Sequence, residues 1–265
     1  MKATVRHCFL ILLGLAFSVG GALAAPSAEE IMTNSFLASK VADSTTDVTF
    51  RLRTAAGQER IRLTSGPSKL ISGTTDNRRL ITFDAPADVK GTKTLLIEHS
   101  NAEDDIWIYL PAMKKVRRLV ASNKRDSFVG TDFSYGDVIG HKVTDWSHKL
   151  IKEEKADGKD CYVIESLPKN HGVEEISGYS KRISWVDKES WVAVRVDIYD
   201  TNRELLKKIT SEDIREVDPL NHKWQAMKQT SANVQTGHST ILEFKNFKAN
   251  VGVGDNVFTT RSLEN

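Results

Sequence analysis

From position 43 onward, the chain alternates apolar and polar residues over short stretches that end in turn-forming sequences. Such alternation is typical of β-strands that bury one face. Between positions 191 and 199, every even-numbered residue is valine or isoleucine, whereas Arg195 and Asp197 fall on the opposite face. A strand of this kind has one side in water, which is common in antiparallel sheets. The pattern therefore predicts a fold dominated by antiparallel β-structure.

Five hairpins are predicted, because paired strand-like runs flank short turns. Asp157-Gly158 is a strong turn signal, since glycine accepts a positive φ. An antiparallel sheet as wide as this meander must curl or be covered. The expected pairs are 48–53 with 60–64, 106–110 with 116–120, 148–154 with 161–165, 183–186 with 191–199, and 191–199 with 204–209, and further strands are expected at 80–83, 94–98, 223–228 and 240–247.

The stretch 106–110, Ile-Trp-Ile-Tyr-Leu, is apolar on both faces. Such a strand either lies between two layers or turns one face toward an apolar cavity. The pattern alone favours the position between two layers, because packed cores are commoner than cavities.

One short helix is expected before the strands begin. Ser27 is a suitable N-cap, and Glu29 and Glu30 favour the positive end of the helix. Ile31 and Phe36 would give this helix an apolar face.

The first 24 residues predict a secretory signal peptide. Lys2 and Arg6 precede an apolar run over 9–19, and the small residues of 22–25 form a cleavage site of the Ala-x-Ala type. The apolar run is shorter than the roughly 20 residues that a spanning helix needs, which disfavours the alternative of an uncleaved anchor. We therefore expect a signal peptide at 1–24 and a single exported domain at 25–265.

Composition excludes some classes of function. Of the 37 basic residues, two lie in the signal segment, which leaves 35 against 35 acidic residues. A neutral protein lacks the overall positive charge that attracts nucleic acid, so we expect no nucleic-acid binding. Outside the signal segment Cys161 is the single cysteine, and it lies in a strand-like run, which indicates a buried bystander rather than a nucleophile.

The sequence offers little catalytic chemistry. His141, Asp145 and His148 would share one face of a helix and could then hold a metal. However, Trp146, His148 and Leu150 alternate as in a strand, which would separate Asp145 from His148. No nucleophile elbow or phosphate-binding loop is present. We therefore expect no catalytic residue, metal or cofactor.

Two other features carry candidate functions. Six cations fall within twelve residues at 114–125, where they form either the solvated edge of a hairpin or a docking patch for an acidic partner or anionic lipid headgroups. The stretch 127–137 then places three aromatic residues among glycines and small polar residues. It suits either a mobile lid over a site or a loop that anchors aromatic rings in the core.

Two neighbouring motifs carry a family resemblance. Residues 107–118 read WIYLPAMKKVRR, and residues 127–137 read SFVGTDFSYGD. Together they resemble the outer-membrane lipoprotein-sorting, or LolA-like, family. The sequences at 83–92, 184–187 and 199–200 are also similar to that family. Thr131 and Val129 depart from its usual serine and methionine, which affects no expectation about the fold.

The resemblance implies an α+β fold dominated by antiparallel β-structure, in which a curled half-barrel sheet and a few covering helices enclose an apolar cavity. It also implies a periplasmic carrier that shields the acyl chains of a lipid or lipoprotein during transfer toward the outer membrane. An inner-membrane exporter of the resistance-nodulation-division (RND) type is the implied partner. A regulator that senses lipid or lipoprotein on the same fold is the alternative.

On this basis, three sets of residues are candidates for function. A carrier that shields acyl chains from water is favourable, because each acyl methylene exposed to water costs about 0.8 kcal/mol. The candidates are Trp107, Tyr109 and Leu110 for the cavity wall, Phe128, Phe133 and Tyr135 for its lid or rim, and Lys114, Lys115, Arg117 and Arg118 for docking to a partner or headgroup.

Overall fold

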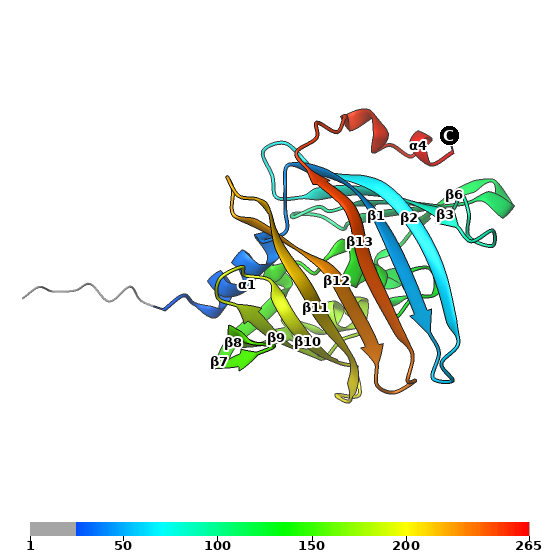
Figure 1. The fold of residues 1–265 in the computed structure, drawn as a ribbon. Helices are drawn as coiled ribbons and strands as arrows, with labels where there is room; N and C mark the ends of the chain where they lie inside the picture. Colours follow the sequence, from blue (N-terminus) through cyan, green and yellow to red (C-terminus); the bar gives the residue numbers. More distant parts are fainter. Residues whose placement is uncertain (1–24, 265) are drawn as a thin grey trace, which may run out of the picture.

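The computed structural model describes residues 25–264, so the predicted signal peptide at 1–24 lies outside the described residues. Within residues 25–264, thirteen strands form one antiparallel sheet that curls around a concave face (Figure 1). The strands are β1 (Asp43–Arg53), β2 (Glu59–Leu70), β3 (Asn77–Ala85), β4 (Lys93–Ile97), β5 (Asp105–Leu110), β6 (Lys115–Leu119), β7 (Trp146–Ala156), β8 (Lys159–Pro168), β9 (Lys181–Asp187), β10 (Ala193–Tyr199), β11 (Leu205–Asp218), β12 (Lys223–Asn233) and β13 (Ser239–Ala249).

The helices are few and short. Helix α1 begins after Ser27, whose hydroxyl accepts from the Glu30 backbone while the Glu30 carboxylate accepts from the Ser27 backbone. This reciprocal capping confirms the predicted start of the helix. The helices are α1 (Ala28–Leu37), α2 (Tyr135–Ile139), α3 (His171–Ser177) and α4 (Arg261–Glu264), with 3₁₀ turns at Pro111–Met113, Ala121–Arg125, Phe128–Gly130, Val143–Asp145 and Asp255–Val257. In the part of the chain that the structure describes, no helix has the length and apolarity to cross a membrane.

The sheet order follows the chain in two meanders. The strand order is β6-β5-β4-β3-β2-β1-β13-β12-β11-β10-β9-β8-β7, so the first and last strands are neighbours at its centre. Their register places Phe50 of β1 opposite Leu242 of β13 and Val48 opposite Phe244. All five predicted hairpins and all four further strands are confirmed.

The two edges of the sheet are joined by a segment that we name the crossing segment, residues 120–145. It leaves the edge strand β6 and enters the opposite edge strand β7. Its aromatic residues pack against Phe50 of the central strand β1, so it spans the concave side rather than the outer rim. Phe128 is fully buried, its ring centroid 6.3 Å from that of Phe50 and 5.2 Å from that of Tyr135.

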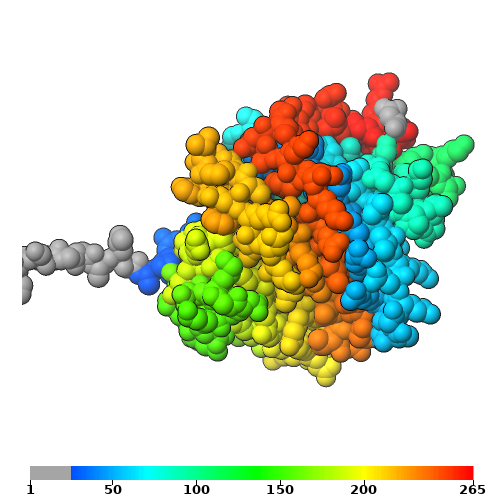
Figure 2. Space-filling view, in the orientation of Figure 1, coloured from blue at the N-terminus to red at the C-terminus, as the bar shows by residue number. Residues whose placement is uncertain are grey.

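Strand β5 is covered on both faces. Ile106 joins the core cluster of the crossing segment, whereas Trp107 and Tyr109 pack on the other side with Phe258 and Leu263 from the end of the chain. The space-filling view shows this C-terminal segment, in red, lying over one end of the outer surface (Figure 2). The doubly apolar strand therefore lies between two layers, as the pattern alone favoured, and not at a cavity wall, as the family resemblance led us to expect.

The predicted fold class is confirmed. The structure is an α+β fold dominated by antiparallel β-structure, with a curled half-barrel sheet that does not close and a few covering helices. Cys161 lies fully buried in β8, and burial raises the pKa of its thiol. Such a thiol is poorly nucleophilic, in agreement with the prediction of a bystander.

Candidate functional site

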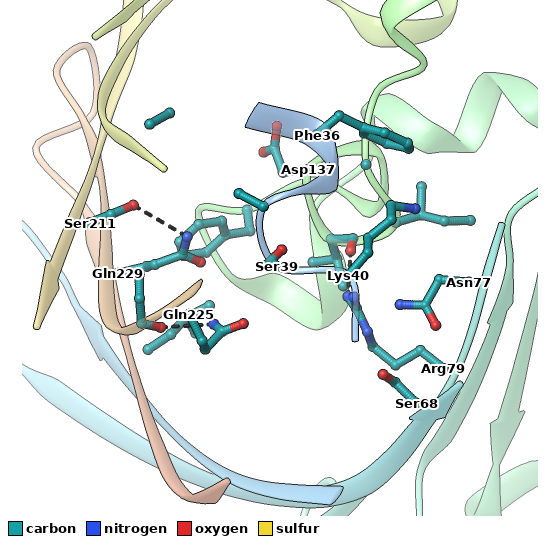
Figure 3. A pocket seen from close by; sticks show the side chains of 18 of the residues that line it. Phe36, Ser39, Lys40, Ser68, Asn77, Arg79, Asp137, Ser211, Gln225 and Gln229 are labelled. Carbon is teal, nitrogen blue, oxygen red and sulfur yellow. Dashed lines mark hydrogen bonds between the residues drawn. The ribbon is translucent and has the colours of Figure 1, made fainter. Parts of the chain in front are cut away.

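A cavity of about 420 Å³ lies on the concave face of the sheet, between the central strands and a cover made of α1 and the crossing segment (Figure 3). Its volume falls within the range of about 300–1,000 Å³ that is usual for ligand pockets. Much of its lining is apolar, and includes Met32, Phe36, Val48, Phe50, Leu80, Ile81, Phe133, Ile209, Leu242, Phe244 and Phe247.

Small residues on the inner face keep this space open. Ser68, Ser184, Ser211 and Ala226 line the cavity at positions where larger side chains would fill it. Gly66 also lines the cavity but is required for a different reason, because a Cβ atom at this position would come within 1.8 Å of the backbone carbonyl oxygen of Leu80 on β3. The curl of the sheet supplies the concavity, and the short side chains prevent the protein from filling it.

Helix α1 forms one part of the cover. Ile31 is fully buried against Ile164 and Val186 of the neighbouring strands. At the end of the helix, the backbone N–H of Trp224 donates to the carbonyl of Ala38 over 2.8 Å. These contacts hold α1 against the concave side of the sheet.

One wall of the cavity is charged. The ammonium of Lys40 pairs with the carboxylate of Glu98 and donates to the carbonyl of Thr75 over 2.8 Å. Burial raises the pKa of Glu98 and lowers the pKa of Lys40, although each charge partly offsets the shift of the other. Arg79 lies beside them and donates to the carbonyl of Val138 over 2.7 Å (Figure 3).

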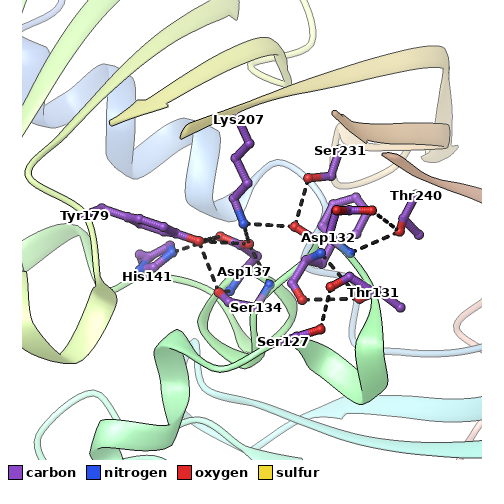
Figure 4. A network of polar contacts seen from close by, with 11 residues as sticks. Ser127, Thr131, Asp132, Ser134, Asp137, His141, Tyr179, Lys207, Ser231 and Thr240 are labelled. Carbon is purple, nitrogen blue, oxygen red and sulfur yellow. Dashed lines mark hydrogen bonds and ion pairs between the residues drawn. The ribbon is translucent and has the colours of Figure 1, made fainter. Parts of the chain in front are cut away.

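A buried ion pair anchors the crossing segment to the sheet. The Lys207 ammonium on β11 lies 2.5 Å from the Asp137 carboxylate on α2, and both side chains are only 5% exposed (Figure 4). The Tyr179 hydroxyl donates to the same carboxylate at 3.0 and 3.1 Å, and His141 Nε2 lies 3.4 Å from it. Ser134 caps α2 and exchanges hydrogen bonds with Asp137.

The charged groups in this cluster shift one another's pKa values. Burial acts to raise the pKa of Asp137, but the Lys207 ammonium and the His141 ring hold it well below its usual range. Burial acts to lower the pKa of Lys207, but Asp137 outweighs this effect and raises it. Burial and the Asp137 charge raise the pKa of Tyr179 to about 12. The pair is therefore fully ionised, while the tyrosine remains a neutral donor.

A second anchor lies at Asp132 (Figure 4). Its carboxylate accepts from the Thr240 hydroxyl of β13 over 2.7 Å, and its carbonyl accepts from the Ser231 hydroxyl of β12 over 3.0 Å. Lys207 also donates to this carbonyl over 3.0 Å. The crossing segment is thus bonded to three successive strands, which fixes it across the concave face.

The candidate wall residues lie elsewhere. Trp107 and Tyr109 face the C-terminal segment on the outer side of β5, and neither they nor Leu110 line the cavity described here. The walls of this cavity come instead from β1–β3, from the start of β7 and from β9–β13.

The candidate lid residues lie in the crossing segment, buried in one core cluster. Phe133 lines the cavity, whereas Phe128 and Tyr135 do not. Burial, followed by the charge of Asp126, raises the pKa of Tyr135 to about 12. Of the two interpretations of this stretch, aromatic anchors in the core match the observed packing, and Phe133 also contributes to the cavity.

The basic cluster lies on the edge strand β6 and the turn before it. Lys114, Lys115, Arg117 and Arg118 are all exposed. Arg118 pairs with Asp105 of the neighbouring strand, and its guanidinium carbon lies 5.7 Å from the ring centroid of Trp107. Free cations at a sheet edge deter pairing with other strands, and they also suit a docking surface.

The histidines considered for metal binding have other partners. His148 lies in β7 as the alternation predicted, with Nδ1 2.8 Å from the Ser166 hydroxyl and Nε2 3.1 Å from the carbonyl of Val143. Over residues 25–264, no three acidic, histidine or cysteine residues are arranged to hold a metal ion.

Sequence reasoning missed the charged residues of the site. The Ser134-x-x-Asp137 spacing is a capping-box signal, so α2 could have been found from it. Lys207 carried no comparable signal, because it is followed by another lysine in the same strand and only the fold distinguishes the two. Lys40 and Arg79 could not be predicted either, because they line the cavity only once segments distant in the sequence are brought together.

Comparisons with known proteins agree with the fold. A family model described as "-like: Uncharacterized protein" matches residues 75–265. No curated protein matches the chain. A "putative outer membrane lipoprotein-sorting protein domain" from Vibrio parahaemolyticus is 30% identical with a TM-score of 0.82, over 90% of this chain and 98% of the other.

Two further solved structures are similar. A DUF1329 family protein from Desulfovibrio piger is 30% identical with a TM-score of 0.81, over 89% of this chain and 97% of the other. A LolA superfamily protein from Nitrosomonas europaea shares the fold at 19% identity, with a TM-score of 0.68, over 90% of this chain and 100% of the other. The chain therefore belongs to the family of these outer-membrane lipoprotein-sorting and DUF1329 relatives, and it has the LolA-like fold.

Proposed function

We propose that this protein is a periplasmic carrier that shields the acyl chains of a lipid or lipoprotein during transfer toward the outer membrane. The observation that carries the proposal is the apolar cavity under α1 on the concave face of the sheet. The "lipoprotein-sorting" description of the relative from Vibrio parahaemolyticus supports the same class of cargo.

The physical need for such a carrier is large. Each methylene that leaves the membrane for water costs about 0.8 kcal/mol, so a two-chain lipid with roughly thirty methylenes would cost on the order of 20 kcal/mol. A cavity that removes the chains from water lowers this cost without chemical catalysis. The proposal accordingly assigns no catalytic residue, metal or cofactor.

Cargo must enter the cavity past its cover, which consists of α1 and the crossing segment. The crossing segment is held by the buried Asp137–Lys207 pair and by Asp132, whereas α1 is held by apolar packing and by hydrogen bonds to its last carbonyls, one of them from Lys223, and its own residues form no ion pair within the described part of the chain. Apolar packing can slide without leaving a buried charge unpaired, so α1 is the element that we assign as the moving cover. Met32 and Phe36 on its inner side would then contact the acyl chain.

Residues 1–24 serve as a cleaved signal peptide that exports a single domain, 25–265, to the periplasm. An inner-membrane exporter of the RND type delivers or receives the cargo. The exposed cations of the β6 edge, Lys114, Lys115, Arg117 and Arg118, form the docking surface for that partner or for lipid headgroups.

Extraction of the purified protein with organic solvent, followed by mass spectrometry, tests the carrier function. We expect a lipid or an acylated peptide to be recovered in a defined ratio to protein. A protein that is purified without lipid and that binds none when lipid is added would contradict the proposal. Cross-linking in cells distinguishes a carrier, captured with an exporter and an outer-membrane acceptor, from a lipid-sensing regulator, captured with a signalling protein.

A further inference from the structure

The cavity carries more positive than negative charge. Its charged lining residues are the four cations Lys40, Arg79, Lys142 and Arg182 and the two carboxylates Glu98 and Asp137. Each carboxylate already has a lysine partner: Glu98 pairs with Lys40, and Asp137 pairs with Lys207.

Two guanidiniums therefore face the cavity without a carboxylate of their own. Arg79 donates to the neutral carbonyl of Val138, and the carboxylate nearest to it, Glu98, is already paired with Lys40. Arg182 has a buried Nε with no hydrogen-bond partner, and its guanidinium carbon lies 5.6 Å from the ring centroid of Trp146. Lys142 differs from both, because it is directed away to the carbonyl of Ala102.

Both arginines lie close to the same stretch of the crossing segment, residues 137–141. Arg79 contacts Val138 directly. Arg182 is near enough to His141 that, after burial, its charge is the next cause that lowers the pKa of that histidine. Burial lowers the pKa of each arginine, and the charges of Glu98 on Arg79 and of Asp137 on Arg182 offset this only in part, so each buried charge is costly.

Buried charges are usually paired, but the two carboxylates of this cavity are each already paired with a lysine, so neither arginine has a carboxylate of its own. We propose that the cavity binds amphiphiles with a single anionic head, a carboxylate or a phosphate, held by Arg79 and Arg182 while the acyl chain lies along the apolar lining. This inference rests on the carrier function and specifies the chemical class of its cargo. Guanidinium groups suit both anions, because their fork of donors matches the paired oxygens.

Equilibrium dialysis of the purified protein against palmitate, hexadecyl phosphate and hexadecanol tests the proposal, since these probes share one chain length and differ in the head. We expect both anions to bind on the order of tenfold more tightly than the alcohol, as a charge-assisted hydrogen bond allows. The double variant Arg79→Gln/Arg182→Gln should reduce anion binding to the level of the alcohol and leave alcohol binding unchanged.

Arg60→Gln is the matched control, because Arg60 is exposed on β2 outside the cavity, and it should leave all three affinities unchanged. Arg182→Lys, which keeps the charge, should retain part of the preference for anions. If the double variant does not fold, the three affinities of the unaltered protein still show whether it prefers an anionic head.

The outcomes separate the two proposals. Equal binding of all three amphiphiles overturns the anionic head and leaves the carrier function standing. Failure of all three to bind overturns both proposals. Inorganic phosphate that binds as tightly as hexadecyl phosphate would identify a site for the free anion and overturn the assignment to a lipid headgroup.

Discussion

At the scale of single residues, the Asp137–Lys207 pair controls the position of the crossing segment. Asp137→Asn leaves the Lys207 ammonium buried without a charge partner, so we expect the free energy of unfolding to fall by about 3–5 kcal/mol. Urea denaturation measures this change. Asp213→Asn is the control, because Asp213 pairs with Arg215 at the exposed surface and should have little effect. Equal losses in the two variants would contradict the assigned role.

The same pair has a predictable pH dependence. The pKa of Asp137 is lower in the folded protein than in the unfolded chain, where an aspartate titrates near about 3.9. Its contribution to stability is therefore complete above about pH 4 and is lost as the pH falls toward the folded-state pKa. In Asp137→Asn, the decline in the free energy of unfolding between about pH 4 and pH 2 should be shallower than in the wild type. Denaturation curves measured across this pH range for both proteins test the prediction, and equal slopes would contradict it.

Phe128 and Phe133 offer a comparison between core and cavity. Both rings are buried in the same cluster, but Phe133 also lines the cavity. Replacing either with alanine should reduce the free energy of unfolding by about 3–5 kcal/mol. Only Phe133→Ala should alter lipid binding, measured at a temperature where both variants remain folded. A similar change in binding for Phe128→Ala would indicate that general loosening of the core, rather than a cavity contact, affects the ligand.

At the scale of elements, α1 is the proposed moving cover, and Ile31 is its main anchor. Ile31→Ala should cost about 2–5 kcal/mol through the lost apolar contacts. We also expect faster amide hydrogen exchange along α1 and faster release of bound lipid. Thr33→Ala, at an exposed position of the same helix, is the control. Unchanged exchange in α1 together with unchanged lipid release would contradict its role as the cover.

The elements themselves could be predicted from the sequence because their signals are local. The alternation between 191 and 199, the Asp157-Gly158 turn and the Ser27 N-cap each depend on neighbouring residues, and each was confirmed. The place of the aromatic residues at 127–137 depends instead on the order of strands in the sheet. Only once β6 and β7 are known to be opposite edges does the segment between them have to cross the concave face.

The basic edge strand β6 is a second element with a predicted role. Replacing Lys115 and Arg117 with glutamate reverses two exposed charges and should weaken binding to the exporter or to anionic vesicles, with little effect on stability. Sedimentation with vesicles and cross-linking in cells measure the two kinds of partner separately. Lys152 and Lys155, on the opposite edge strand β7, provide a matched control. If both double variants behave as the wild type does, the β6 edge is only a protected sheet edge.

At the scale of the whole molecule, one topological feature produces the site. The two meanders join through β1 and β13, so the crossing segment must connect their outer edges over the concave face. The site residues could not be predicted because the cavity combines positions from nearly the whole chain, from Met32 to Phe247. Trp107 and Tyr109, by contrast, had a suitable local pattern but lie under the C-terminal segment.

The most direct test of a hollow, lipid-binding interior uses two adjacent positions of β12. Gln229 lines the cavity, and its amide lies 3.4 Å from the Ser211 hydroxyl (Figure 3). The preceding residue along the strand, Lys228, points to the other face and pairs with Glu212. Native mass spectrometry should show that Gln229→Trp, which fills the cavity, abolishes lipid binding while Lys228→Trp retains it. If Gln229→Trp is folded and binds lipid as well as Lys228→Trp does, acyl chains do not occupy this cavity.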